Sequence, residues 1–173
     1  MATKVAKLMR AYIDALPERQ RRLLERNPKI KAHFSVDPPE PLAAALPTLD
    51  PKVTRTLSPQ LKDRFAIAGR IVENAWVYLT PAAIPRTVKS AAFKKTLAAH
   101  REYWDESAPM QFPNQQLSLF ALIGEDLADG DLIYLVWPQE DAKEPELWEY
   151  FGQSETRYKD VAAYLEARLP THP

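Results

Sequence analysis

The stretch Leu117–Phe151, LSLFALIGEDLADGDLIYLVWPQEDAKEPELWEYF, decides the fold class. It contains two apolar runs, Leu117–Ile123 and Leu132–Trp137, and the second is apolar at every position. Short runs of this kind are typical of strands that are covered on both faces. The loop between them holds Asp129-Gly130, a pair that favours a hairpin turn. Leu147–Phe151 has the length of a third strand, so the stretch predicts a three-stranded antiparallel meander.

Helical spacing of apolar residues predicts helices on both sides of this meander. Downstream, a stripe ending at Leu169 predicts a closing helix that Pro170 stops; its members are Tyr158, Val161, Ala162, Leu165 and Leu169. Upstream, the spacing predicts four helices: Thr3 to Leu16, Pro17 to Asn27, Ser58 to Leu79, and Ser90 to Trp104. Ser58 is expected to cap the third of these, with Pro59 at its first position.

Prolines dominate the segment between the second and third of these helices. Seven of them lie between Pro28 and Pro59. Because proline lacks a backbone donor and restricts its predecessor, we expect an irregular, extended loop with one helical turn at Leu42–Leu46. No strand is predicted before residue 115. The chain of 173 residues is expected to be one α+β domain: residues 1–110 mainly helical, packed on an antiparallel sheet within 115–170 that a terminal helix closes.

Composition excludes several classes of protein. The chain has no cysteine, so disulfides, thiolate metal sites and a cysteine nucleophile are excluded. The first ten residues alternate charged and apolar side chains, unlike a secretory signal, and about 18 consecutive apolar residues occur nowhere. We therefore expect a cytoplasmic protein without membrane contact.

Charge is divided unevenly along the chain. Residues 1–101 carry 19 Lys and Arg against 8 Asp and Glu, whereas residues 102–173 carry 4 against 15. Two interpretations remain open and are compatible: the halves attract each other within one fold, or one of them is a docking surface that steers a partner of opposite charge.

Few residues suit catalysis. The three histidines, His33, His100 and His172, have no metal-ligand spacing, and a structural role is expected for His100. The four glycines are too scattered for a phosphate-binding loop. No catalytic residue, no metal, no cofactor and no small-molecule substrate is predicted.

Two acidic loops flank the second strand. Glu125–Asp131 does not have the ligand spacing of a calcium-binding EF-hand, so we favour a solvated hairpin tip over a partner surface, and either over a cation site. Gln139–Glu146 raises the same alternatives. A basic group near the N-terminus lacks interleaved aromatics that would stack bases, which disfavours direct nucleic-acid binding; it comprises Arg19, Arg21, Arg22, Arg26, Lys29 and Lys31.

The segment Phe120–Leu169, about 50 residues, resembles the C-terminal part of the SUKH superfamily. The matching features, in order, are Ile123-Gly124, Asp129-Gly130-Asp131, Trp137, Glu144-Pro145-Glu146-Leu147-Trp148 and a closing helix through Leu165. Upstream, the segment from Leu16-Pro17-Glu18 to Asn27 is similar to an early helix of the family, with Pro28 where the family has glycine.

This resemblance implies an α+β immunity protein that binds and neutralises a cognate protein toxin, or an adaptor in a larger assembly. If the toxin is a nuclease, acidic residues are expected to cover its basic substrate site. The predicted partner-binding residues are Asp126, Asp129, Asp131, Glu140, Asp141 and Glu144. The alternatives are a small hydrolase with a metal held by carboxylates, and a module that binds nucleic acid through the basic N-terminal helix.

Overall fold

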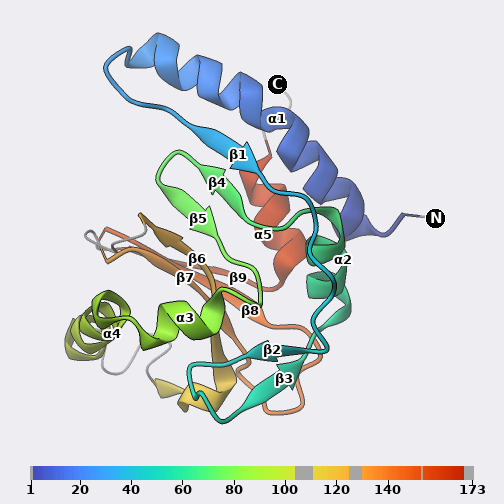
Figure 1. The fold of residues 1–173 in the computed structure, drawn as a ribbon, viewed down its shortest axis with the longest axis vertical. Helices are drawn as coiled ribbons and strands as arrows, with labels where there is room; N and C mark the ends of the chain where they lie inside the picture. Colours follow the sequence, from blue (N-terminus) through green and yellow to red (C-terminus); the bar gives the residue numbers. More distant parts are fainter. Residues whose placement is uncertain (1, 104–110, 125–129, 153, 170–173) are drawn as a thin grey trace.

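The protein is described here by a computed structural model that covers residues 2–103, 111–124, 130–152 and 154–169 (Figure 1). The helices of this part of the chain are α1 (Lys4–Arg26), α2 (Pro59–Ile67), α3 (Ile84–Lys89), α4 (Ala91–Tyr103) and α5 (Val161–Arg168), with a 3-10 turn η2 (Asn114–Gln116). The strands are β1 (Phe34–Val36), β2 (Ala45–Pro47), β3 (Thr54–Thr56), β4 (Ile71–Glu73), β5 (Trp76–Tyr78), β6 (Leu117–Ile123), β7 (Leu132–Val136), β8 (Glu146–Phe151) and β9 (Ser154–Tyr158).

Seven of the strands form one antiparallel sheet in the order β1-β4-β5-β6-β7-β8-β9. β6 and β7 are buried at every position, as expected for strands covered on both faces. β2 and β3 form a separate two-stranded sheet at the end of the molecule farthest from the C-terminal end of α1 (Figure 1). The predicted α+β class is confirmed: N-terminal helices and a C-terminal helix pack on an antiparallel sheet.

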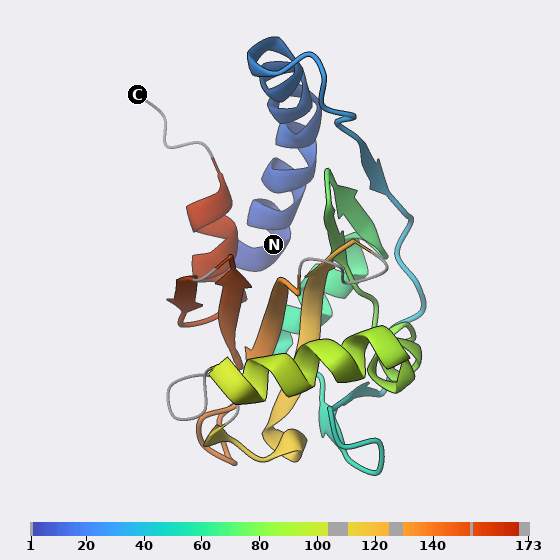
Figure 2. The ribbon, with the colours of Figure 1, turned by 90° about the vertical axis from the view of Figure 1, so that its left-hand side faces the viewer.

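Helices cover both faces of the sheet. α1 contacts α2 and α5 on the face that carries Glu73 and Tyr78. α4 covers the other face, where His100 contacts Tyr134 and Tyr150, and it lies well away from α1 (Figure 2). The buried apolar side chains between these layers form one hydrophobic cluster.

The two helices predicted on either side of Pro17 are one continuous helix, α1, with Pro17 inside it. Thr3 is its N-cap, as predicted, and accepts a hydrogen bond from the Ala6 N–H. Pro17 is exposed, so its ring takes no room in the core, although the helix loses the hydrogen bond to the Ile13 carbonyl and must accommodate the ring beside that carbonyl. Burial of Val5, Met9, Tyr12 and Leu16 on the opposite face outweighs that loss.

The helix predicted from Ser58 to Leu79 is wrong beyond Ile67. Ser58 caps α2 and Pro59 stands in its first turn, as predicted, but the chain then turns into the hairpin β4–β5. A Cβ on Gly69 would lie 2.5 Å from the Pro38 carbonyl oxygen, so this approach of two backbones requires glycine. Asn74 turns the hairpin with a φ of 55°, a left-handed conformation that asparagine tolerates.

Three further predictions are wrong. The proline-rich loop contains β1, β2 and β3, and β2 lies where a helical turn was predicted. The meander has a fourth strand, β9, which takes up Tyr158 from the predicted closing helix. The absence of strands before residue 115 is contradicted by five strands, three of which join the main sheet.

Replacing Pro17 with alanine is expected to raise the free energy of unfolding by about 2 kcal/mol. Proline in a helix interior is about 3 kcal/mol less favourable than alanine, and part of this gain is lost because alanine leaves the unfolded chain more freedom. Denaturant titration of the wild type and of Pro17→Ala measures the difference.

Pro59→Ala is the matched control, because the first position of a helix has no hydrogen bond to restore. We expect a loss of about 0.5 kcal/mol there, the unfolded-state effect alone. A Pro17→Ala variant no more stable than Pro59→Ala would contradict a continuous α1.

Candidate functional site

A network of buried hydroxyl and carboxylate groups joins α1 and α5 to the sheet. The Tyr12 hydroxyl donates to Glu73 Oε2 and lies 3.0 Å from the Tyr78 hydroxyl, which lies 2.8 Å from the Tyr164 hydroxyl. Arg19 forms an ion pair with Glu73 at 2.7 Å. Burial raises the pKa of Tyr12, Tyr78 and Tyr164, so all three phenols stay protonated. We assign this network to structure, because its groups bond to one another.

His100 is buried between α4 and the sheet, with an exposed fraction of 5%. Its Nε2 lies 2.8 Å from the Gly130 carbonyl oxygen and its Nδ1 lies 2.9 Å from the Tyr134 hydroxyl. A carbonyl only accepts, so Nε2 carries the proton, and the neutral ring accepts from Tyr134 at Nδ1. Burial lowers the pKa of His100, against a smaller opposite effect of the Gly130 carbonyl. This geometry supports a structural role for His100. Its side chain is more deeply buried than the sequence indicated.

An open cleft lies between β3, the start of α2 and the loop that joins β7 to β8. Its volume is about 590 Å³. Its floor includes Trp137, and the Arg55 guanidinium lies 4.9 Å from the centre of that indole ring. Arg55 Nη2 also donates to the Glu140 carbonyl oxygen at 2.6 Å, which fixes the strand to the loop.

Cations outnumber anions on the walls of this cleft. Lys62 of α2 and Lys143 of the β7–β8 loop line it together with Arg55, against one carboxylate, Glu140. Both lysine side chains are exposed. Burial lowers the pKa of Arg55, although Glu140 counteracts this effect, and the guanidinium stays charged. The cleft therefore presents positive charge above the buried ring of Trp137.

The structure does not bring the predicted acidic residues together. Asp126 and Asp129 lie outside the described residues. Asp131 precedes β7, whereas Glu140, Asp141 and Glu144 follow it. The 5 residues of β7 span about 17 Å. The acids that the structure describes therefore lie at opposite ends of β7.

The four described acids also differ in their bonding. Asp131 is 8% exposed, and its Oδ1 accepts from the Gly152 N–H at 2.8 Å. Glu144 Oε1 accepts from the Gln60 N–H at 3.1 Å, in the first turn of α2, where a negative charge is favourable. Glu140 and Asp141 are exposed. Of these four, Glu140 is both exposed and part of the cleft lining, and Asp141 is exposed on the same loop. Asp131 and Glu144 are assigned to structure.

The basic group on α1 is partly neutralised by carboxylates. Besides the pair that Arg19 forms with Glu73, Arg21 pairs with Glu18 and Glu25, and Arg22 pairs with Glu18. These pairs weaken the attraction of the helix for phosphate groups. Within residues 2–103, 111–124, 130–152 and 154–169, no group of three or more His, Cys, Asp or Glu could hold a metal ion. In the same ranges, no helix is both long and apolar enough to cross a membrane.

Sequence reasoning missed the cleft because it missed β3. Thr54-Arg55-Thr56 alternates β-branched residues with one long side chain between two prolines, which is a weak signal of a strand. No pattern in the sequence links this strand to Trp137 and Lys143, which lie about 80 residues later.

Comparisons of the chain with protein-family models, with curated proteins and with solved structures found no match.

His100 is expected to make stability fall as the pH drops below 6.5, the ordinary pKa of histidine. Its pKa is lower in the folded protein, so the unfolded chain binds more protons in the window below 6.5, and acid favours unfolding there. The dependence reaches at most about 1.4 kcal/mol per pH unit. Chemical denaturation of wild type and His100→Gln across pH measures it. A difference between the two proteins that does not change below pH 6.5 would contradict this burial.

Glu144→Ala is expected to lower the free energy of unfolding by about 1 kcal/mol, because it removes the acceptor at the start of α2. Asp141→Ala, an exposed acid in the same loop, should change it by less than about 0.5 kcal/mol. Thermal and denaturant melts compare them. Equal effects of the two substitutions would mean that Glu144 has no capping role.

Proposed function

We propose that this chain is a non-catalytic protein-binding protein, an immunity protein that binds and neutralises a cognate protein toxin. The observation that carries the proposal is the open cleft between β3, α2 and the β7–β8 loop. It brings together the exposed cations Lys62 and Lys143, which form no ion pair within the described ranges, and the exposed acid Glu140, a combination suited to a charged protein partner.

The buried ionisable groups support this function because they already serve the fold. His100 holds α4 to the sheet, and Glu73 joins α1 to the β4–β5 hairpin. A catalytic acid or base must reach a substrate, whereas both of these groups are more than 90% buried among their partners.

The element order in the C-terminal third also supports the proposal. Strand β6, the loop to β7, the acidic loop to β8 and the closing helix α5 follow one another as the SUKH resemblance implies, with β9 added before the helix. The contacts of α5 with α1 and α2, and the pairing of β5 with β6, join this third to the rest of the chain.

Glu140 and Asp141 give the partner surface its acidic rim. They are exposed on the same loop that supplies Lys143 to the cleft. If the toxin is a nuclease, its substrate site carries cations for phosphate groups, and this rim would pair with them and exclude nucleic acid. Asp126 and Asp129, which lie outside the described residues, remain proposed members of the partner surface.

Affinity capture with the intact chain, from the cells that produce it, tests the proposal. We expect one protein to bind at a stoichiometric ratio and to lose its toxic activity in the complex. The double variant Glu140→Lys, Asp141→Lys should bind this protein about tenfold more weakly at low salt, mainly through slower association.

The control reverses two exposed acids that do not line the cleft, Asp14 of α1 and Glu102 of α4, to lysine, so that the change in net charge is the same. Its affinity should equal that of the wild type. A captured protein that keeps its full activity in the complex, or the absence of any stoichiometric partner, would refute the proposed function.

A further inference from the structure

Within the described part of the chain, backbone groups at the outer edge of β3 form no backbone hydrogen bond. The Thr48 N–H donates to the Val53 carbonyl at 3.2 Å, so these two residues are a hydrogen-bonded pair of the β2–β3 ladder. Such pairs recur at every second residue of an antiparallel ladder, which makes Leu46 and Arg55 the next one. Thr54 and Thr56 therefore direct their N–H and C=O groups away from β2. Neither residue forms a backbone hydrogen bond on that side within the described part of the chain.

The other edge of the same hairpin, on the side of β2, is hydrogen-bonded to β6 of the main sheet. This agrees with Thr54 and Thr56 directing their backbone groups away from β2. The Ser118 hydroxyl donates to the Pro47 carbonyl at 2.6 Å, and the Leu49 N–H donates to the Leu117 carbonyl at 2.9 Å. Of the two strands of this hairpin, β3 is thus the one whose outer edge stays free within the described residues. Its residues from 54 to 56 border the cleft, and Thr54 and Thr56 are exposed.

Charged side chains beside this edge would determine which residues a strand that paired with β3 could carry. Lys62 and Lys143 form no ion pair with any residue of the described ranges, and Arg55 bonds only a backbone carbonyl there. An acidic side chain on an added strand would gain these cations as partners. A basic side chain would be repelled by all three.

We propose that the partner inserts an extended, acid-bearing segment into the cleft and pairs it with β3 as a third strand. This inference rests on the proposed function and specifies its recognition chemistry. Main-chain hydrogen bonds to Thr54 and Thr56 supply affinity independently of sequence, and the lysines at the cleft supply the preference for acidic residues.

A second copy of this chain fits the edge poorly. Pairing β3 with itself across a two-fold axis would bring Arg55, Lys62 and Lys143 of both copies together, and like charges repel. The edge strand β9 is a weaker template, since it carries the ion pair Arg157–Glu155, and charged side chains discourage pairing.

The test uses the intact chain and a short peptide with blocked ends in which Val and Glu alternate. We expect the peptide to slow hydrogen exchange at the Thr54 and Thr56 amides and to shift their NMR signals, while the Arg55 amide, already bonded to β2, changes little. A peptide with Lys in place of Glu should leave the Thr54 and Thr56 amides unchanged. The absence of any response at these two amides up to millimolar Val-Glu peptide overturns the proposal.

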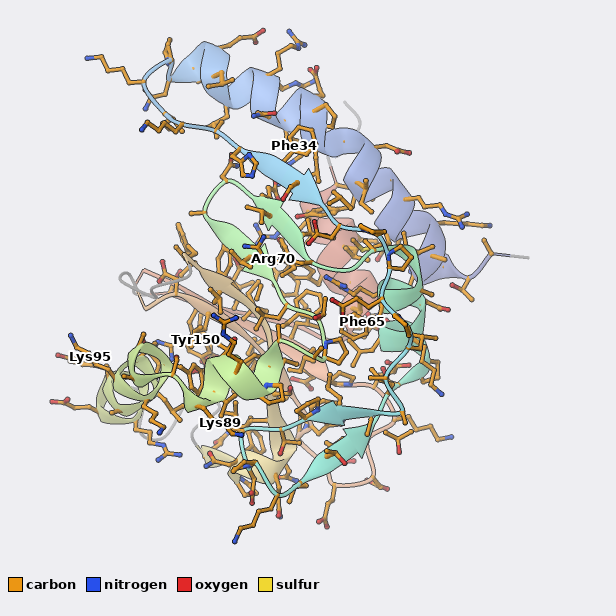
Figure 3. All side chains as sticks on the ribbon, viewed as in Figure 1. Phe34, Phe65, Arg70, Lys89, Lys95 and Tyr150 are labelled. Atoms are coloured by element: carbon orange, nitrogen blue, oxygen red, sulfur yellow. The ribbon has the colours of Figure 1, made fainter. Side chains whose placement is uncertain are left out.

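Charge variants test the selectivity. Lys62→Glu with Lys143→Glu should weaken binding of the Val-Glu peptide at least about tenfold. Lys94→Glu with Lys95→Glu changes the net charge equally on exposed α4 positions and should leave binding unchanged; Lys95 projects from α4 at a distance from β3 (Figure 3). Equal effects of both pairs would mean that only the net charge matters, and would overturn the proposal.

The captured partner separates this inference from the function on which it rests. A partner whose affinity is unchanged by Lys62→Glu with Lys143→Glu, and which leaves exchange at Thr54 and Thr56 unchanged, overturns strand addition but leaves the proposed function standing. A failure to capture any partner, with a normal peptide response at β3, refutes the immunity function and leaves the edge as a peptide-binding site.

Discussion

The pairing of β6 with strands from distant parts of the chain is the constraint on which the structure depends. β6 lies at the centre of the seven-stranded order, with the N-terminal hairpin β4–β5 on one side and the meander β7–β9 on the other. All of its seven residues are buried. Its first residues also hold β2 through the bonds of Leu117 and Ser118, so the same strand fixes the position of the β2–β3 hairpin.

This dependence links the core to the cleft. Because β6 holds β2, the hairpin presents β3 outward. The backbone of Glu140 then accepts from Arg55, and the side chain of Glu144 accepts from the first turn of α2. The acidic C-terminal part of the chain thus contacts the basic N-terminal part through backbone groups at this place. The Lys4–Glu166 pair joins the same two parts at α1 and α5. Attraction between the two halves is therefore a feature of this fold.

Arg64 is a buried charged residue with incomplete hydrogen bonding among the described residues, which costs free energy of folding. Its side chain is 1% exposed and lies against Phe65 and Phe120. Nη1 donates to the carbonyls of Ala68 and Gly69, which would otherwise be left without partners at the end of α2, whereas Nε and Nη2 have none within the described part of the chain. Burial lowers the pKa of Arg64 to about 10, so it remains charged at neutral pH. The tight turn between α2 and β4 requires this arrangement.

Local patterns sufficed to predict β6, β7, β8 and α4, because long apolar runs and helical spacing dominate there. They failed from Ala68 to Leu79, where Ala68, Val72, Ala75, Trp76 and Leu79 fit a helical period by coincidence. Tertiary pairing with β1 and β6 overrides that period, as it commonly does for β-branched and aromatic segments. β9 has a polar sequence because it lies at an edge, so no apolar alternation marks it.

The same limit applies to the candidate site. The sequence indicated that the β7–β8 loop is acidic, and the structure shows Glu140 and Asp141 exposed on it, with Glu140 lining the cleft. It could not show that Glu144 reaches α2 or that Arg55 stacks on Trp137, since both contacts join segments that are distant along the chain.

The structure of the chain in complex with its captured partner tests the central claim most directly. We expect an extended segment of that partner beside β3, hydrogen-bonded to Thr54 and Thr56, with its carboxylates near Lys62 and Lys143. A partner bound elsewhere, for example against the arginines at the end of α1, with the cleft left open, would contradict it.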